Sequence, residues 1–153
     1  MDEEVLRRAK AAAFRLLKIR PRSIGEIQKK FTLKGVPADI AERIVADLEA
    51  RGFLDDAAFA RAWTQGRIKR YGPRRVKREL EQKGVPKDLI GRVWEDLKVE
   101  YDEEGAARSL AQRRMASREQ QGVPILKKKK RVMDYLLRRG FSPLVVGKVI
   151  REL

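Results

Sequence analysis

Apolar residues along the chain recur at the spacing of amphipathic helices, and Gly and Pro interrupt them at regular places. Leu6, Ala9, Ala13, Leu16 and Leu17 follow one another at helical spacing, which is typical of one buried helix face. Runs of β-branched and aromatic residues, which favour strands, are scarce. The pattern therefore predicts an all-α protein.

The apolar pattern repeats along the chain. The tetrapeptide Lys-Gly-Val-Pro occurs at 34–37 and again at 83–86, an offset of 49 residues. The same offset superposes five apolar positions, and a further shift of 56 residues reaches a third set. Because all five positions keep helical spacing, we infer three tandem copies of one unit. The three sets are Ile27, Phe31, Ile40, Ile44 and Leu48, then Val76, Leu80, Leu89, Val93 and Leu97, then Val132, Leu136, Val145, Val149 and Leu153.

Gly, Pro and capping residues predict three helices in the first copy. Pro21 ends one helix, and Ser23 with Glu26 fits a capping box at the start of the next. Gly35 supplies the left-handed position that ends this second helix. Pro37 fits the first turn of a third helix, where its missing N–H costs little.

The other two copies carry equivalent signals. The dipeptide Gly-Pro at 72–73 opens a helix that Gly84 closes, and Pro86 opens the next one. In the third copy Asp102 is a predicted N-cap, and Gly140 ends a helix that starts near residue 125. We predict that Phe59, Ala62 and Trp63 face inward on the first helix of the second copy. The predicted repeats span 1–52, 53–100 and 101–153.

One repeat of about 50 residues has a marginal core when it stands alone. Stacked copies bury one another's apolar edges, as in other helical repeat proteins. The expected architecture is therefore an all-α array of three tandem three-helix repeats, elongated and curved.

Composition excludes several classes of function. The chain has 153 residues with no Cys and no His, which excludes thiol catalysis, disulfides, Cys/His zinc sites and His-dependent acid–base chemistry. A carboxylate-only metal site is left open. The sequence has neither a P-loop nor a dinucleotide fingerprint, so we expect a protein that is not an enzyme and has no cofactor. The acidic start and the lack of a long apolar run predict a cytoplasmic protein without a signal peptide or membrane span.

The charge is strongly positive and unevenly distributed. The net charge is +15 and the pI is about 10.5. Residues 61–92 carry 11 basic and 3 acidic side chains, residues 93–107 carry 1 and 6, and residues 108–153 carry 13 and 3. A charge kept only for solubility would be more uniform, so two basic blocks predict a polyanionic partner, most often nucleic acid.

Fourteen residues of these two blocks form the candidate interface. Val76 and Leu80 lie four positions apart and should face the core, so the basic side chains around them point outward or lie at the margin. Five consecutive basic residues at 127–131 repel one another in a helix, and binding to phosphate or docking to an acidic groove would offset that cost. A solvated helix face is the alternative interpretation. The candidates are Arg67, Lys69, Arg70, Tyr71, Arg74, Arg75, Lys77, Arg78, Lys127, Lys128, Lys130, Arg131, Arg138 and Arg139.

Acidic and aromatic residues offer further candidates. The acidic pair 55–56 and the acidic triplet 102–104 each precede a helical segment, which predicts helix capping. Metal ligation by the pair and contact with a basic partner surface by the triplet are the alternatives. Trp63 and Trp94 lie at positions that fit a core, with base stacking as the alternative. Tyr71, beside a Gly in a loop, is the better candidate for a functional aromatic.

Several quoted segments resemble one known family. "RGFLDDAAFA" at 51–60, "YGPRRVKRELEQKGV" at 71–85 and "KKKRVMDYLLRRGF" at 128–141 are similar to the RecX family of recombinase regulators. The opening "LLKIRPRSIGEIQKKF" at 16–31 resembles that family's first repeat. The resemblance covers nearly the whole chain and implies a fold built from three-helix repeats.

The resemblance also implies a role. Members of the family bind the RecA recombinase and its filament on single-stranded DNA, restrain strand exchange and co-protease activity, and in many cases bind DNA. The expected partners are therefore RecA, the RecA–single-stranded DNA filament and DNA, with no membrane partner and a monomer as the simplest state. A nucleic-acid-binding module that acts without RecA is the alternative, and a purely protein-binding scaffold is a third.

Overall fold

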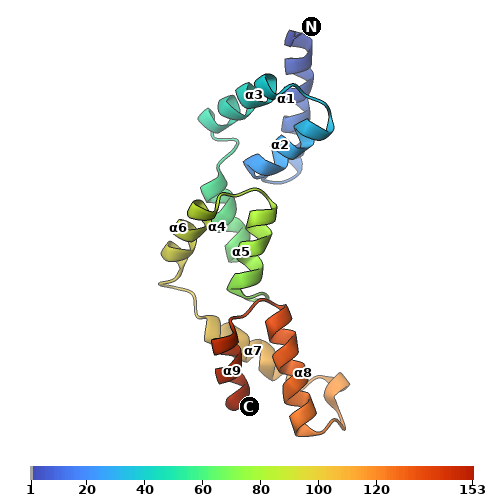
Figure 1. The fold of residues 1–153 in the computed structure, drawn as a ribbon, viewed down its shortest axis with the longest axis vertical. Coiled ribbons are helices and arrows are strands. Elements are labelled where there is room, and N and C mark those ends of the chain that lie inside the picture. The colour runs from blue at the N-terminus through green and yellow to red at the C-terminus, as the bar shows by residue number, and fades with distance from the viewer. Residues whose placement is uncertain (1) are drawn as a thin grey trace. The chain divides into compact units, whose positions relative to one another are not determined.

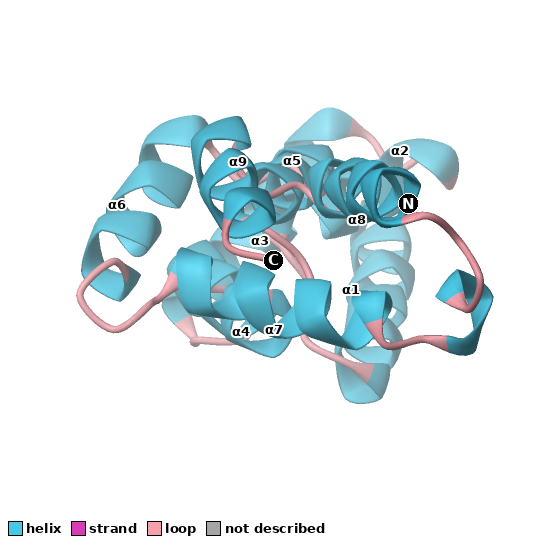
Figure 2. Cartoon of the chain, turned by 90° about the horizontal axis from the view of Figure 1, so that it is seen from below, coloured by secondary structure: helices cyan, strands magenta, loops and turns pink. Residues whose placement is uncertain are grey.

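The chain is helical throughout the part that the structure describes. A computed structural model describes residues 2–153, which form nine α-helices and one short 3-10 helix and contain no β-strand (Figures 1 and 2). The predicted all-α class is confirmed. The helices are α1 (Asp2–Ile19), α2 (Ile24–Leu33), α3 (Ala38–Ala50), α4 (Asp56–Arg67), α5 (Pro73–Gln82), α6 (Lys87–Leu97), α7 (Glu103–Met115), η1 (Arg118–Gln120), α8 (Ile125–Arg138) and α9 (Pro143–Arg151).

Helices start and end at the predicted signals. Ser23 accepts a hydrogen bond from Glu26 N, and the Glu26 side chain accepts one from Ser23 N, which completes the predicted capping box. Gly35, Gly84 and Gly140 follow helix ends with φ values of 73°, 82° and 93°. Because a side chain is strained at such angles, Gly stops these helices where other residues would not.

The described chain forms two compact units. One consists of Met1–Ala62 with Leu80–Val93, and the other of Trp63–Glu79 with Trp94–Leu153. The division passes through α4, α5 and α6, so the helices of the middle repeat contribute to both units.

The core of the first unit lies between α1, α2 and α3. Ala13 and Leu48 are fully buried, as is Ile27, and Phe31 is nearly so. Leu54, which follows α3, closes the same cluster. The small Ala residues on α1 allow the larger side chains of α2 and α3 to pack against the helix backbone.

The core of the second unit lies between α7, α8 and α9. Val132 and Leu136 on α8 and Val149 on α9 are completely buried against Ala107 and Ala111 on α7. These positions match those of the first unit, because a shift of 105 residues places Ile27 on Val132. The same arrangement of a small first-helix face and larger second- and third-helix side chains is therefore used twice.

The first helix of each repeat recurs at a spacing of 47 residues, which differs from the offsets of 49 and 56 residues at the other repeated positions. Ala13, Ala60 and Ala107 lie 47 residues apart, and each is completely buried. This equivalence places Ala9 on α1 at the position that Asp56 occupies on α4.

Three details of the predicted packing are wrong. Leu89 and Val145 are only half-buried, and their neighbours Ile90 and Val146 take the core positions at 3% and 1% exposure. One residue corresponds to a turn of 100° around the helix axis, so α6 and α9 present a slightly different face from α3. Leu97 is half-buried and Ala62 is exposed, whereas Leu153, also half-buried, packs against the core of the second unit.

In the first unit, the start of α2 meets the end of α5 (Figure 1). Ser23 Oγ donates a hydrogen bond to Lys83 O over 2.5 Å. A Cβ atom added to Gly25 would lie 2.6 Å from that same oxygen, so the backbones touch. Ile24 N donates to Asp56 Oδ1 over 2.9 Å. We name this contact the Ser23–Lys83 junction.

In the second unit, the start of α5 meets the end of α8 in an equivalent way. Gly72 N donates to Arg139 O over 2.7 Å, and Arg74 N donates to Gly140 O over 3.0 Å. A side chain on Gly72 would collide with the backbone of Gly140 and Phe141. We name this contact the Gly72–Arg139 junction.

Both junctions pair groups that a helix leaves unsatisfied. The first N–H groups and the last C=O groups of an α-helix have no partner within the helix. Its aligned peptide dipoles also place partial positive charge at its start and partial negative charge at its end. A helix start against a helix end therefore stabilises both.

Candidate functional site

The fourteen predicted interface residues all lie in the second compact unit. They occupy the end of α4, the loop before α5, α5 itself and α8. Two sequence blocks that are far apart meet there, because Arg139 Nη1 after α8 donates a hydrogen bond to Arg70 O in the loop over 3.1 Å. The structure thus brings the two blocks together at the Gly72–Arg139 junction.

Helix α5 presents its charge outward as predicted. Val76 and Leu80 are completely buried, whereas Arg74, Lys77 and Arg78 are exposed. Pro and Gly define the ends of this helix, and its two buried positions fix its rotation about its axis. The exposed basic side chains therefore have a defined direction.

Tyr71 is surrounded by guanidinium groups. The Cζ atoms of Arg67, Arg75 and Arg139 lie 4.3, 4.1 and 4.6 Å from the centre of its ring. Each distance suits a cation–π interaction, in which the negative ring face attracts the cation. The three arginines come from α4, α5 and the end of α8, so the ring connects three segments of the unit.

One carboxylate partly neutralises this cluster. Glu79 accepts hydrogen bonds from Arg67 Nε and Nη2 over 2.6 and 2.7 Å and from Trp63 Nε1 over 3.1 Å. Burial raises the pKa of Glu79, but the bonds from Arg67 and Trp63 outweigh it and hold the pKa below its usual value. Glu79 therefore stays ionised and orients Arg67 beneath Tyr71.

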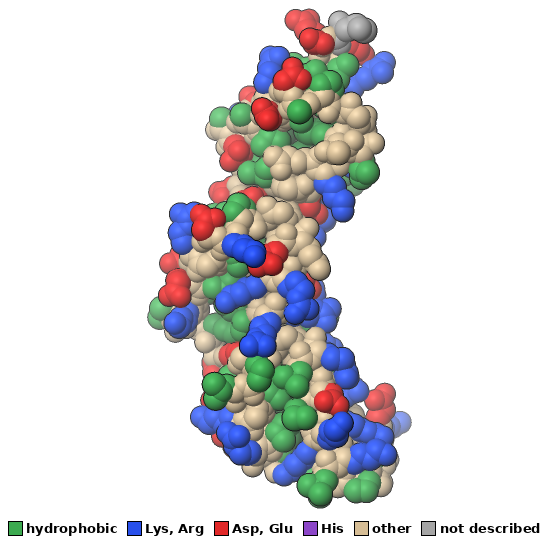
Figure 3. All heavy atoms as spheres, viewed as in Figure 1, with side chains coloured by type: hydrophobic (Ala, Val, Ile, Leu, Met, Phe, Trp, Pro, Cys, Tyr) green, Lys and Arg blue, Asp and Glu red, His purple; other side chains and the backbone are tan. Residues whose placement is uncertain are grey.

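The candidate residues separate into two groups. Arg67, Tyr71, Arg75 and Arg139 are half-buried and occupied by contacts with one another. Among the others only Lys130 has an acidic partner within residues 2–153, Asp134 at 3.9 Å. Blue side chains crowd the region of Figure 3 where Figure 1 places α5 and α8. The exposed group consists of Lys69, Arg70, Arg74, Lys77, Arg78, Lys127, Lys130, Arg131 and Arg138, and Lys128 is half-buried.

Helix α8 combines cations with exposed apolar side chains. Ile125 and Leu126 at its start are 55% and 80% exposed, directly before the basic run 127–131. Leu137 near its end is 41% exposed. A surface of this composition suits a partner that offers both negative charge and apolar contact.

Sequence reasoning missed one member of the basic region, Arg114 on α7. Its Cζ lies 4.7 Å from the ring centre of Tyr135, and it lines a hollow of about 260 Å³ with Arg131 and Arg138 of α8. The hollow is also lined by Gln120, whose side-chain oxygen is buried without a hydrogen-bond partner among residues 2–153. The dipeptide Arg113-Arg114 in the last turn of α7 was the available signal.

Two of the five acidic candidates cap the helices that they precede, and three have other partners. Asp55 accepts a hydrogen bond from Ala58 N over 3.1 Å, and Asp102 accepts one from Gly105 N over 2.9 Å, so each caps its own helix. Asp56 instead accepts from the start of α2 at the Ser23–Lys83 junction. Burial, and then neighbouring carboxylates, raise the pKa of Asp56 despite that bond. Glu103 accepts a hydrogen bond from Ser142 Oγ before α9, and Glu104 pairs with Arg108 and Lys148.

Both tryptophans have structural contacts. Trp94 is 7% exposed, and Lys77 Nζ lies 5.2 Å from its ring centre. Trp63 is half-buried and bonded to Glu79. These positions agree with the packing interpretation.

Neither a membrane span nor a metal-binding cluster is found among residues 2–153. No described helix is long and apolar enough to cross a membrane. No group of three or more acidic side chains within that range is arranged to hold a metal ion.

The chain matches three family models that describe the three-helix domains of RecX. The model of the first domain matches residues 9–48, that of the second residues 55–93, and that of the third residues 102–150. Each matched stretch contains parts of three consecutive α-helices.

Relatives and solved structures agree with these matches. Proteins named Regulatory protein RecX from Thermobifida fusca (strain YX) and Mycobacterium ulcerans (strain Agy99) are 32% and 33% identical to this chain, which they cover by 98% and 93%. The alignments span 80% and 82% of those relatives. The crystal structure of RecX from Lactobacillus salivarius has the same fold, with a TM-score of 0.81 at 19% identity over 99% of this chain and 97% of that one. The chain therefore belongs to the RecX family of regulatory proteins.

Proposed function

We propose that this protein binds RecA and its filament on single-stranded DNA, and that it restrains strand exchange, ATP hydrolysis and co-protease activity in DNA repair and the SOS response. Membership of the RecX family supports the regulatory part of the proposal. The group of exposed cations in the second unit supports the proposed contact with a nucleoprotein filament. Such a group attracts phosphate backbones and acidic protein surfaces alike.

The Tyr71 cluster holds this surface in place. Arg67, Arg75 and Arg139 are engaged with the ring, and Glu79 also binds Arg67 and Arg75, so these residues fix the loop between α4 and α5 against the end of α8. Arg74, Lys77 and Arg78 are exposed and have no acidic partner among residues 2–153, so they can reach phosphate groups. Bound along a filament, the protein would hinder the addition of RecA protomers and block access to the DNA in strand exchange.

A strand-exchange assay with purified RecA tests the regulatory proposal. We expect exchange and ATP hydrolysis to fall as the protein is added, and we expect replacement of Arg74, Lys77 and Arg78 by Ala to weaken this inhibition. Lys29, Lys30 and Arg43 are exposed cations of the first unit, and their replacement by Ala is the matched control with equal loss of charge. Undiminished strand exchange at saturating protein would rule the proposal out.

The unpaired cations also favour the alternative of a nucleic-acid-binding protein that acts without RecA. Titration of labelled single-stranded DNA with and without RecA, at two salt concentrations, separates the two functions. The triple Ala variant should reduce the salt slope by about 2 if all three residues contact phosphate, because each contact with single-stranded DNA contributes about 0.7. Tight binding to DNA without any effect on RecA would support the alternative.

A further inference from the structure

Two of the three second helices have their C-terminal ends covered by a helix start. The end of α5 receives α2 at the Ser23–Lys83 junction, and the end of α8 receives α5 at the Gly72–Arg139 junction. Both ends are tightly covered, because a Cβ on Gly84 would lie 2.8 Å from Gly25 Cα and one on Gly140 would meet the backbone of Arg75.

The end of α2 has the same sequence as the end of α5, but within residues 2–153 no helix start covers it. Its sequence Lys-Gly-Val at 34–36 is identical to that at 83–85 after α5. A Cβ added to Gly35 would meet nothing within 4 Å. Within residues 2–153 no hydrogen bond reaches Lys34 O, although the equivalent Lys83 O is bonded by Ser23. The acceptor that the junction uses is therefore vacant at this end.

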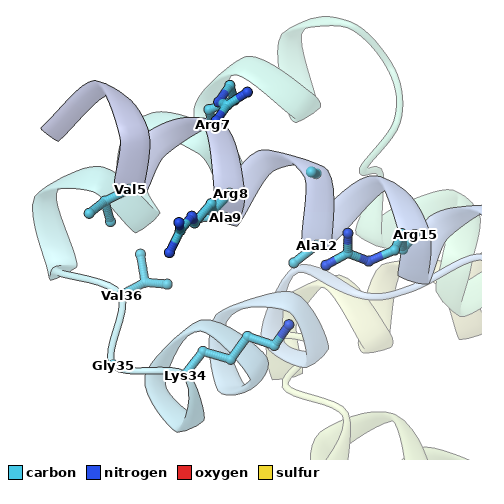
Figure 4. A pocket seen from close by; sticks show the side chains of 10 residues that line it. Val5, Arg7, Arg8, Ala9, Ala12, Arg15, Lys34, Gly35 and Val36 are labelled. Atoms are coloured by element: carbon cyan, nitrogen blue, oxygen red, sulfur yellow. The ribbon is translucent and has the colours of Figure 1, made fainter. Parts of the chain in front are cut away.

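A hollow of about 640 Å³ lies at this open end, between α1 and the segment 34–36 (Figure 4). Val5, Ala9, Ala12 and Val36 give it an apolar floor. Ala9 occupies the position at which Asp56 accepts the Ile24 N–H in the Ser23–Lys83 junction, so a small side chain leaves room there. We name this hollow the α2-end groove.

The α2-end groove has a basic rim. Arg7, Arg8, Arg15 and Lys34 line it, and Figure 4 shows Lys34 at the end of α2 and Arg15 farther along α1. Glu4 pairs with Arg7 and Arg8 at 2.8 and 3.0 Å, which leaves Arg15 and Lys34 without an acidic partner among the described residues. In the Ser23–Lys83 junction the incoming helix brings Glu26, which lies 3.5 Å from Lys83 Nζ.

We propose that the α2-end groove receives the acidic first turn of an α-helix from a partner protein. The turn would bring a small residue against Gly35, a donor for Lys34 O and carboxylates for Arg15 and Lys34, as α2 does at the end of α5. A helix start fits better than a nucleic-acid backbone because the floor is apolar and two of the four cations are already paired. The proposal does not depend on the function proposed above, since every residue in it lies in the first unit.

A peptide that carries this chain's own docking turn provides the probe. We would use a fluorescein-labelled peptide of residues 21–33 with Lys29→Glu and Lys30→Glu, which keeps Ser23, Gly25 and Glu26 and makes the helix acidic. Fluorescence anisotropy with the full chain should show saturable binding. The same peptide with Gly25→Leu should bind about tenfold more weakly, because the larger side chain prevents the backbone contact.

Protein variants locate the binding site. Arg15→Glu with Lys34→Glu should weaken peptide binding about tenfold, which corresponds to two lost rim ion pairs. Lys18→Glu with Arg43→Glu is the matched control, because both residues are exposed and neither lines the groove. The affinity for single-stranded DNA should change equally in the two double variants, since each changes the net charge by the same amount.

Three results would overturn the proposal. One is the absence of saturable peptide binding, or binding that Arg15→Glu with Lys34→Glu leaves unchanged. Another is a selective loss of DNA affinity in that variant, which would assign the groove to nucleic acid. The third is a dimer, detected by sedimentation, that this variant alone dissociates, which would assign the groove to a second copy of the chain. None of these results bears on inhibition of RecA by the second unit.

Discussion

At the Ser23–Lys83 junction the docking helix reaches the covered helix end through a side-chain hydroxyl, whereas at the Gly72–Arg139 junction it does so through backbone N–H groups. Ser23 Oγ reaches the end of α5, and Asp56 receives the Ile24 N–H. At the other junction Gly72 N and Arg74 N bond directly to the end of α8. The same contact between a helix start and a helix end can therefore form without any capping side chain, provided that Gly allows the backbones to touch.

The two junctions also differ in charge. At the first, Glu26 is bonded to Arg20 and lies near Lys83, so acidic and basic groups balance. Burial raises the pKa of Glu26, but the bonds from Arg20 and Ser23 outweigh it and leave the pKa lowered. At the second, three guanidinium groups surround Tyr71, and Glu79 pairs with two of them, those of Arg67 and Arg75. The difference indicates that positive charge exceeds structural need only at the Gly72–Arg139 junction.

The largest effect is expected from Gly140→Ala. This residue combines a φ of 93° with contact between its position and the Arg75 backbone. Strain of about 1–2 kcal/mol and overpacking of about 1–3 kcal/mol should together lower the free energy of unfolding by about 3 kcal/mol. Gly35→Ala has a similar φ of 73° but open space, so it should cost only about 1 kcal/mol. Urea denaturation of the pair measures the difference, and equal losses would contradict a tight Gly72–Arg139 junction.

Glu79→Gln tests the single carboxylate of the Tyr71 cluster. We expect a loss of about 2 kcal/mol in the free energy of unfolding, because Arg67 loses charge-assisted hydrogen bonds. The lowered pKa means that Glu79 stabilises the fold above its unfolded pKa and loses this effect as the pH falls through its folded pKa. The variant should therefore be less sensitive to acid below about pH 4.5. Glu81→Gln, at an exposed position of the same helix, is the control and should change neither quantity.

Ser23→Ala removes the side-chain contact of the other junction. Loss of the N-cap and of the bond to Lys83 O should lower the free energy of unfolding by about 1–2 kcal/mol. Ser109→Ala, at an exposed position of α7, should have little effect. Thermal unfolding followed by circular dichroism compares the two, and equal melting temperatures would show that Ser23 is dispensable.

The smallest effect is expected from Asp56→Asn. The amide oxygen still accepts the Ile24 N–H, so at neutral pH the free energy of unfolding should change by less than about 0.5 kcal/mol. Because the folded-state pKa of Asp56 is raised, the folded state binds the proton more tightly, and the natural protein loses stability as the pH rises through that pKa. Urea denaturation at several pH values between about 4 and 7 should show this loss of stability in the natural protein and not in the Asp56→Asn variant. A large loss at pH 7 would mean that the negative charge itself stabilises the junction.

Sequence patterns located most of the helices because their signals are local. The capping box at Ser23 and Glu26 and the left-handed Gly35 depend on residues a few positions apart. The failure at Leu89 has the opposite origin. Its neighbour Ile90 is equally apolar, so the choice between them depends on how α6 packs rather than on its sequence.

Part of the candidate site could likewise be predicted from the sequence, and part could not. The outward direction of Arg74, Lys77 and Arg78 followed from the buried positions of Val76 and Leu80. That Arg67, Arg75 and Arg139 gather around Tyr71 did not, because Arg139 lies 68 residues beyond Tyr71 and no local pattern links them. The dipeptide Arg113-Arg114 was visible in the sequence, but only the fold places Arg114 beside Tyr135.

By itself the sequence determined the helical repeats, the helix ends and the excess of positive charge, since each depends on composition or on short-range spacing. Only the tertiary structure decided which cations are held inside the Tyr71 cluster and which remain exposed, because that choice depends on contacts between distant segments. It also decided that two second helices have covered ends while the end of α2 is open. The motif Lys-Gly-Val is identical at 34–36 and 83–85, and what distinguishes the two copies is the helix start that packs against one of them.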